Sequence, residues 1–189
     1  MKHMGTKTDK RSLLVDAANR LVYAQGFKQT TLADIAQGAE VPIGNVYYYF
    51  KTKDDIGQAL IGHRTDYYLG IIGEWGKLPD PRKRILAFIK MVADNRETLA
   101  QSGCPIGSLC QELHKDGGPL ADMAAGMFSV FLEWLEEQFR LLGMKRKSFE
   151  HALHLLSALQ GASLLANTFK DPKLVLRETS RLHEWVDTL

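Results

Sequence analysis

Hydroxyl, amide and cationic side chains that could contact nucleic acid lie between residues 31 and 53 of the 189-residue chain. Thr31 could offer its hydroxyl and its helix N-terminal amides to a phosphate, Tyr47 could reach one with its phenol, and Lys53 adds a positive charge. Asn45 carries an amide that can pair bidentately with adenine. In complexes with duplex DNA, phosphate contacts set orientation and base contacts set specificity, and this mixture of groups could make both kinds of contact.

Two short predicted helices must position these groups. One covers residues 31–37 and the other covers residues 42–50, which Pro42 opens. Helices of about seven residues do not persist alone in water. The amphipathic helix before them, which ends before Gly26, must therefore cover their apolar sides. This arrangement predicts a helix-turn-helix whose second short helix enters the major groove.

The stretch from residue 30 to residue 54 resembles the DNA-binding signature of the TetR/AcrR family of transcriptional regulators. It begins Thr-Thr-Leu-Ala-Asp-Ile-Ala and ends Gly-Asn-Val-Tyr-Tyr-Tyr-Phe-Lys-Thr-Lys-Asp. The resemblance implies that phosphates are held by Thr31, Tyr47 and Lys53. It also implies that base edges are faced by Ile43, Gly44, Asn45 and Tyr49. Pro42, at the start of the groove helix, completes the expected DNA-binding set.

Three positions depart from the family pattern. Glu40 stands in the turn where the family often has Gly, Ile43 where it often has a cation, and Tyr49 where it often has His. The operator sequence therefore cannot be carried over from a relative.

Core packing is the alternative for the aromatic run. We expect it for Phe50 and leave it open for Tyr48, whereas Tyr47 and Tyr49 are expected to contact DNA because they share the face that includes the helix start. Composition alone leaves Lys53 balanced between a solvated charge and a phosphate contact, and only the resemblance favours contact.

The whole chain is predicted to be all-α, with about nine helices. We expect a three-helix helix-turn-helix domain over residues 1–52, and a larger helical domain for ligand binding and dimerisation over residues 53–189. Residues 1–5 are left out of this reasoning as a possible expression remnant. Beyond the long helix that Thr52 and Asp55 cap, helices are expected over residues 81–101, 105–117, 119–142, 148–169 and 172–187, with Ser148 as a further cap.

The last two helices are predicted to form a homodimer. The eighth carries small residues at Ser157, Ala158, Gly161 and Ala162, which would let another helix approach closely, and it has no charge over residues 151–169. The ninth carries Val175, Thr179, Leu182 and Val186 on one side. Two such helices from each subunit would make a four-helix interface, and two-fold symmetry fits a palindromic operator. The alternative is that these faces serve only the core of one chain.

A pocket for a small-molecule effector is expected among the helices from the fourth to the eighth. Its predicted lining is apolar and aromatic, and core packing is the alternative for each residue: Tyr68, Trp75, Phe88, Met91, Cys104, Leu109, His114, Met127, Phe131 and Trp134. Because apolar walls with few polar groups suit a small-molecule site, we expect an apolar or aromatic effector and no cofactor.

The two cysteines lie in residues 103–113, a segment similar to one found in a subset of the family, some of whose members sense oxidants or electrophiles. Cys104 precedes a helix start, where the helix dipole favours a thiolate, whereas Cys110 is less obviously placed. Two inert, buried cysteines are the alternative, and it is the one we prefer.

Other classes of function find little support in the sequence. The net charge of +2 gives no strong global field, and the charge-free stretch 151–169 holds too many polar groups for a membrane span. Neither metal-ligand spacing nor a catalytic motif is visible, so no metal and no enzyme activity are expected. With no signal peptide, we expect a cytoplasmic transcription repressor that a small molecule releases from DNA. A helical enzyme or carrier and a protein-interaction module remain alternatives, as does activation in place of repression.

Overall fold

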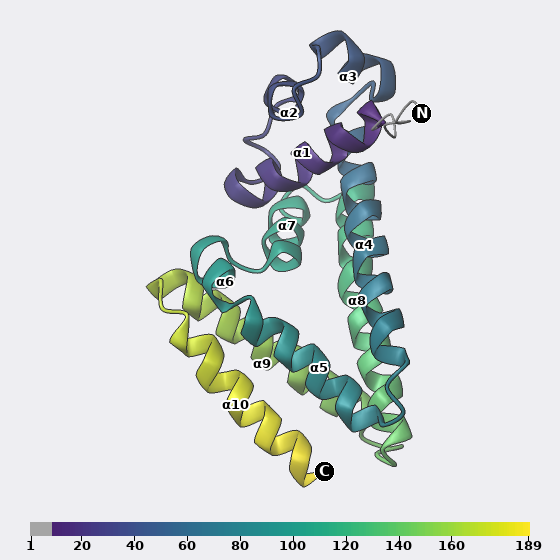
Figure 1. Cartoon of the computed structure of the whole chain (residues 1–189), viewed down its shortest axis with the longest axis vertical. Helices are drawn as coiled ribbons and strands as arrows, with labels where there is room; N and C mark the ends of the chain where they lie inside the picture. The colour runs from purple at the N-terminus through teal and green to yellow at the C-terminus, as the bar shows by residue number, and fades with distance from the viewer. Residues whose placement is uncertain (1–8) are drawn as a thin grey trace, which may run out of the picture.

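The computed structural model describes residues 9–189, and in that part of the chain all regular secondary structure is helical (Figure 1). The predicted all-α fold is therefore confirmed. Residues 1–5, set aside above, and the rest of the first eight residues of the predicted N-terminal domain lie outside the described part. The helices are α1 (Lys10–Gln25), α2 (Leu32–Gly38), α3 (Ile43–Tyr49), α4 (Lys53–Gly76), α5 (Pro81–Asp94), α6 (Arg96–Ser102), α7 (Pro105–His114), α8 (Pro119–Leu141), α9 (Ser148–Phe169) and α10 (Lys173–Thr188).

Helices α1, α2 and α3 enclose a small apolar core of their own. Leu14, Ile35, Val46 and Phe50 are buried in it, and Ile56 joins them from the first turn of α4. Burial of these side chains compensates for the weak intrinsic stability of the two seven-residue helices. The predicted burial of Phe50 is confirmed.

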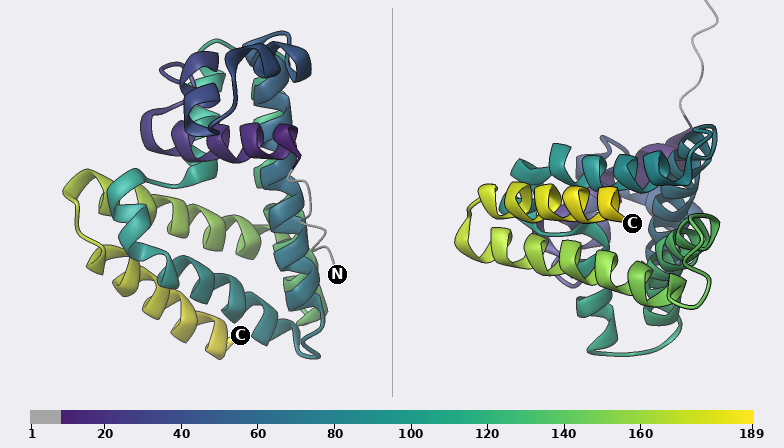
Figure 2. Two further views of the ribbon diagram at one scale, coloured as in Figure 1. Left: turned by 45° about the horizontal axis from the view of Figure 1, so that its top comes forward. Right: turned by 90° about the horizontal axis from the view of Figure 1, so that it is seen from below.

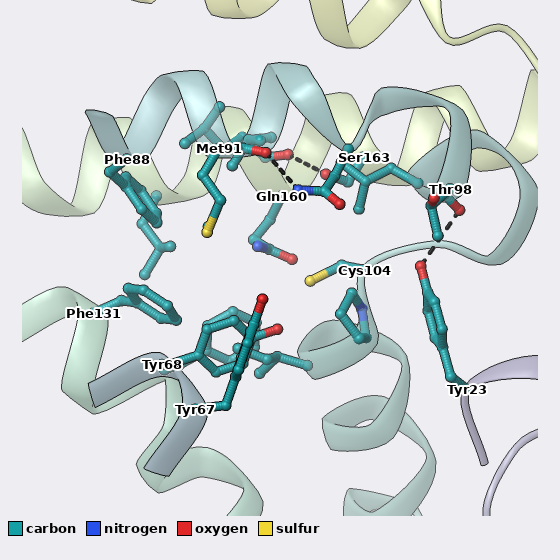
Figure 3. A pocket seen from close by; sticks show the side chains of 18 residues that line it. Tyr23, Tyr67, Tyr68, Phe88, Met91, Thr98, Cys104, Phe131, Gln160 and Ser163 are labelled. Carbon is teal, nitrogen blue, oxygen red and sulfur yellow. Dashed lines mark hydrogen bonds between the residues drawn. The ribbon is translucent and has the colours of Figure 1, made fainter. Parts of the chain in front are cut away.

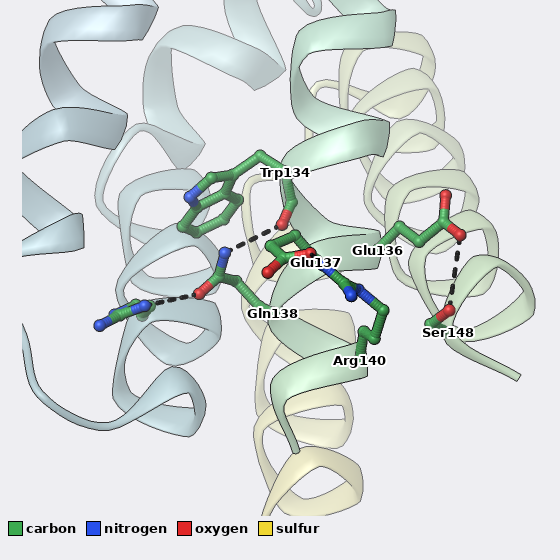
Figure 4. Close-up of polar contacts among 7 residues, drawn as sticks. Trp134, Glu136, Glu137, Gln138, Arg140 and Ser148 are labelled. Atoms are coloured by element: carbon green, nitrogen blue, oxygen red, sulfur yellow. Dashed lines mark hydrogen bonds and ion pairs between the residues drawn. The ribbon is translucent and has the colours of Figure 1, made fainter. Parts of the chain in front are cut away.

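Capping residues fix where two of the helices begin. Thr31 and Asp34 form a capping box at α2, and Thr52 and Asp55 form the predicted capping box at α4. The predicted cap at Ser148 is wrong: Ser148 is the first residue of α9, and its hydroxyl points to Glu136 on α8 (Figure 4). Because Ser148 is buried against α8, its side chain does not bend back to the backbone of its own helix.

The turn between α2 and α3 contains Glu40 at φ +56°, in the left-handed region that favours glycine. This is the turn position at which the family often has Gly. The strain costs about 1–2 kcal/mol for an L-residue, so the turn is held by its surroundings, including Val41, which is buried in the small core.

The remaining helices form a second, larger layer of packed helices (Figures 1 and 2). Helices α4 and α8 lie side by side, α9 packs on α8, and α10 covers α5 and α9. Helix α7 lies between the N-terminal domain and this larger part. The one helix predicted over residues 81–101 is divided at Asn95, whose φ and ψ of −92° and 9° end α5, so α5 and α6 replace it.

A buried polar network fixes the α4–α5 connection to α8. Gln138 is 3% exposed, accepts from Arg84 Nη1 at 3.1 Å and donates to the Trp134 carbonyl at 3.1 Å (Figure 4). Arg84 also donates from Nε to the Leu78 carbonyl at 2.7 Å. Because the buried Gln138 amide is paired through both its oxygen and its nitrogen, the network stabilises one position of the α4–α5 turn.

Candidate functional site

Helix α3 presents one exposed face to solvent. Ile43 is 44% exposed, Tyr47 53% and Tyr48 74%, and nothing lies within 4 Å of a Cβ built on Gly44. Ile43 and Tyr47 are four residues apart, as are Gly44 and Tyr48, which is the spacing that places side chains on the same side of a helix. The face therefore presents the phenols of Tyr47 and Tyr48 beside the apolar side chain of Ile43 and the open position at Gly44.

The exposure of the aromatic residues 47–50 differs from what the sequence suggested for Tyr48 and Tyr49. Tyr49 is half-buried and packs against the core of the N-terminal domain, whereas Tyr48, which the sequence left open, is the most exposed aromatic of the run. Its ring meets Tyr49 edge-on with centroids 4.9 Å apart. The spacing from Gly44 to Tyr48 was the signal that could have revealed this. Asn45 is half-buried at the rim of the face, and Pro42 is exposed at its start.

The polar groups of Thr31 form hydrogen bonds at the start of its own helix, α2. Its hydroxyl donates to Asp34 Oδ2 at 2.7 Å and accepts the Asp34 amide at 3.1 Å. The Thr31 amide donates to the same carboxylate at 2.8 Å, and these hydrogen bonds hold the pKa of Asp34 below its usual range. Thr31 is exposed at the start of α2, but a phosphate would have to share its groups with Asp34.

Lys53 points away from the exposed face of α3. Its Nζ donates to the Lys28 carbonyl at 2.8 Å and lies 4.8 Å from the centroid of the Phe27 ring. Desolvation there lowers the pKa of Lys53. The lysine therefore joins the start of α4 to the loop between α1 and α2, and its predicted phosphate contact stays a prediction.

A cavity of about 180 Å³ lies among α4, α5, α7, α8 and α9 (Figure 3). Five of the predicted pocket residues line it: Tyr68, Phe88, Met91, Cys104 and Phe131. Edge-on and tilted contacts join three of these rings, with centroids 5.1 Å apart for Tyr68 and Phe131 and 5.2 Å for Phe88 and Phe131. One end of the cavity is therefore a continuous aromatic wall.

The other predicted pocket residues lie outside the lining. Trp75 and Trp134 pack behind Phe88, with centroid distances of 5.9 and 6.3 Å. Met127 and Leu109 are buried in the main core. His114 lies near the far end of α7, where its Nδ1 is 2.9 Å from the Cys110 carbonyl.

The polar lining residues were not named from the sequence, although all of them except Tyr23 lie in the helices between which the pocket was predicted. They are Tyr23 from α1, Tyr67 from α4, Asn95 between α5 and α6, Thr98 from α6, and Gln160 and Ser163 from α9. The amide of Gln160 points into the middle of the cavity, toward Cys104 and the tyrosines (Figure 3). Polar residues in the charge-free eighth predicted helix were the available signal.

The cavity has no carboxylate, ammonium or guanidinium group among its described lining residues. Burial raises the pKa of Tyr23 to about 12 and that of Tyr68 further, so both phenols are neutral at neutral pH. A neutral lining disfavours a charged ligand, because a buried charge without a partner is costly.

The two cysteines have different surroundings. Cys104 is half-buried, lines the cavity and caps α7, where its Sγ accepts the Gly107 amide at 3.3 Å. Cys110 is buried, its thiol donates to the Ala124 carbonyl at 3.2 Å, and burial raises its pKa to about 11. Cys110 therefore has the features of an inert thiol, and only Cys104 faces a space that a reagent can enter.

The predicted dimer face of the ninth helix is wrong in its residues. Val175, Thr179, Leu182 and Val186 are buried within the single chain, where α10 packs on α5 and α9. The exposed apolar surface of the last two helices consists instead of Phe149, Leu153, Leu164, Leu165, Phe169 and Leu176. A shallow groove beside it is lined in part by Ala158, Gly161, Ala162 and Leu165, so three of the four predicted small residues lie at this surface.

Two family models match the chain. Residues 14–60 match the bacterial regulatory proteins of the tetR family, and residues 81–181 match the C-terminal domain of LmrA/YxaF-like transcriptional regulators. The chain therefore belongs to the TetR family of bacterial regulatory proteins, and it is a helix-turn-helix transcriptional regulator. Within that family, its C-terminal domain places it with the LmrA/YxaF-like regulators.

Two relatives from Bacillus subtilis align with this chain over more than 90% of its length and of their own. The chain is 26% identical over 176 residues to the HTH-type transcriptional regulator LmrA of Bacillus subtilis (strain 168), which covers 91% of this chain and 94% of that protein. It is 27% identical over 187 residues to the uncharacterized regulator YxaF of the same strain, which covers 93% and 95%.

Solved structures show the same fold. A TetR transcriptional regulator from Legionella pneumophila superposes with a TM-score of 0.80 at 18% identity, over 99% of this chain and 98% of that one. The reduced form of E. coli NemR superposes with a TM-score of 0.79 at 20% identity, over 93% and 96%. Within residues 9–189, no helix has the length and apolar character needed to cross a membrane.

Proposed function

We propose that this regulator represses transcription as a homodimer on a palindromic operator, and that a neutral small molecule entering the cavity releases it. The observation that carries the proposal is that Tyr23 of α1 lines the cavity. A ligand in the C-terminal domain would thus touch the domain that carries the exposed α3 face. In this proposal residues 1–52 form the DNA-binding domain, and residues 53–189 form the domain for effector binding and dimerisation.

Helix α3 would lie in the major groove with its exposed face toward the bases. Ile43 and Gly44 can approach a thymine methyl, and Asn45 at the rim can reach an adenine edge. Tyr47 and Tyr48 present phenols that can donate to phosphates. Tyr49 packs against the N-terminal core and Lys53 donates a hydrogen bond to the Lys28 carbonyl. Because these side chains already have partners within the protein, we propose that they contribute less to DNA binding than Tyr47 and Tyr48.

Dimerisation would use the exposed apolar surface of α9 and α10. Leu164 and Leu165 are 57% and 48% exposed there, and large apolar side chains gathered on one surface favour a protein–protein contact. Binding to a palindromic operator would then require the two copies of α3 to lie about 34–36 Å apart, on successive major grooves.

The effector would be neutral and apolar or aromatic, with a hydrogen-bonding group. The aromatic wall supports an aromatic or apolar body, and the Gln160 amide offers both a donor and an acceptor to a polar substituent. Binding would lower operator affinity only if the ligand prefers the arrangement that does not fit DNA.

The test is selection from a random duplex DNA pool by the purified protein after unfolding and refolding to remove bound ligand. The expected result is an enriched inverted repeat whose binding weakens steeply with salt, because counterions are released. If a stable refolded dimer enriches no sequence, the proposed operator binding is wrong.

A further inference from the structure

The loop between α1 and α2 is bound by a carboxylate from the C-terminal domain. Glu112 of α7 accepts the Phe27 amide at 2.7 Å on Oε2 and the Lys28 amide at 2.6 Å on Oε1. Gly26, at φ +88°, precedes these amides, and a Cβ at this glycine would lie 3.1 Å from Oε2. Hydrogen bonds to an ionised acceptor are among the stronger ones in proteins. An exposed ion pair from Lys28 to Asp116 at 2.7 Å adds a weaker contact beside them.

The same helix begins at the cavity. Cys104 caps α7, and Pro105 and Ile106 in its first turn line the cavity with it. Glu112 is seven positions after Pro105, a distance of about 10 Å along the axis of an α-helix. Because α7 is a continuous ten-residue helix with one face buried on α8, we expect it to move as a unit. A displacement at the cavity would therefore reach the Glu112 carboxylate.

Two further contacts join α1 to the start of this helix. Tyr23 donates from its hydroxyl to the Gly103 carbonyl at 2.8 Å. Arg64 of α4, only 4% exposed, donates to Asn19 Oδ1 at 2.6 Å and to the Pro105 carbonyl at 2.7 Å. The C-terminal half of α1 is thus held at both ends of the segment from Gly103 to Glu112.

We propose that Glu112 is the positioning residue through which occupancy of the cavity changes the orientation of the N-terminal domain. Filling the cavity displaces the start of α7, and Glu112 passes the displacement to the amides of Phe27 and Lys28. The movement then reaches α3 through the core that α1 shares with it. This route is separate from the covalent connection through α4. Its consequence for DNA binding rests on the proposed function.

The test compares Glu112→Gln with Glu133→Gln, which removes an exposed carboxylate on α8. N-ethylmaleimide serves as the probe, because it alkylates a thiol and Cys104 is the cysteine that lines the cavity. A single adduct is verified by mass spectrometry. Hydrogen exchange at the Phe27 and Lys28 amides is then measured with and without the adduct.

In the wild type and in Glu133→Gln, the adduct should speed exchange at both amides about tenfold, the loss expected for a hydrogen bond to a charged group. In Glu112→Gln both amides should exchange fast already, and the adduct should add nothing. Unchanged protection of Phe27 and Lys28 in the alkylated wild type would overturn the proposal. So would an adduct effect in Glu112→Gln equal to that in the wild type.

Operator affinity is the second readout. The adduct should weaken binding of the selected operator in the wild type and in Glu133→Gln, and markedly less in Glu112→Gln. The exchange measurement needs no DNA. Failure to select an operator would therefore refute the proposed function and leave the role of Glu112 decided by exchange alone.

Discussion

At the scale of single residues, exposure on α3 separates groups that the sequence treats alike. Three consecutive tyrosines have the same chemistry, yet the helix turns each by about 100° from the last, so the three cannot share the same surroundings. Tyr49 is half-buried against the core, and Tyr47 and Tyr48 remain available to a ligand. Residue type alone cannot make this distinction, because it depends on where α1 covers α3.

Tyr47→Phe tests the phenol without disturbing the helix. The variant should bind the selected operator about fivefold more weakly, which is ~1 kcal/mol for one hydrogen bond, while the thermal unfolding temperature stays unchanged. Ser129→Ala is the control, because it removes an exposed hydroxyl on α8, outside both α3 and the cavity lining. Fluorescence anisotropy with labelled operator measures both. Equal affinity of wild type and Tyr47→Phe would remove Tyr47 from the DNA contact.

Gly107→Ala tests the centre of the cavity. A Cβ at Gly107 would lie 3.0 Å from Gln160 Oε1, closer than van der Waals contact, so the amide must turn away from its present position. We expect any ligand that hydrogen-bonds to Gln160 to lose about tenfold in affinity, ~1.4 kcal/mol, with little change in stability. Calorimetric titration with an effector found by screening measures this, with Gly126→Ala on α8, where a Cβ meets nothing, as control. Undiminished binding to Gly107→Ala would show that Gln160 takes no part.

At the scale of helices, local signals predicted most boundaries. Capping boxes at Thr31 and Thr52 and a proline at the start of α5 act within a few residues, so the sequence contains them completely. The break at Asn95 has no comparable local signal. The cavity was predicted only in part. Its helices were expected except for α1, which supplies Tyr23, but which side chains of the expected helices face it, such as Thr98 and Gln160, depends on tertiary packing.

Gly57 sets how closely α4 approaches the N-terminal domain. A Cβ there would lie 3.0 Å from the Phe27 ring and 3.1 Å from Leu120 of α8. Gly57→Ala gains about 1 kcal/mol of helix propensity but should lose about 1–3 kcal/mol to overpacking, so its unfolding temperature should fall. Gly62→Ala on the same helix meets nothing within 4 Å, and its unfolding temperature should rise. Thermal unfolding followed by circular dichroism measures both, and equal stabilisation of the two variants would show that the contact at Gly57 is not tight.

At the scale of the whole molecule, the exposed leucines of α9 determine whether two α3 helices act together. Leu164→Asp places a charge in the surface proposed for dimerisation, where it would be buried without a partner, at a cost of several kcal/mol. The wild type should sediment at about 42 kDa, twice the 21.2 kDa of one chain, and the variant as a folded monomer. Leu69→Asp, at a similarly exposed leucine on α4, should remain dimeric.

Because a monomer reaches only one half-site, Leu164→Asp should also lose most of its affinity for the inverted repeat while keeping its binding to a single half-site. A dimeric Leu164→Asp would move the interface away from α9, and a monomer with undiminished operator affinity would show that the two half-sites are not read together.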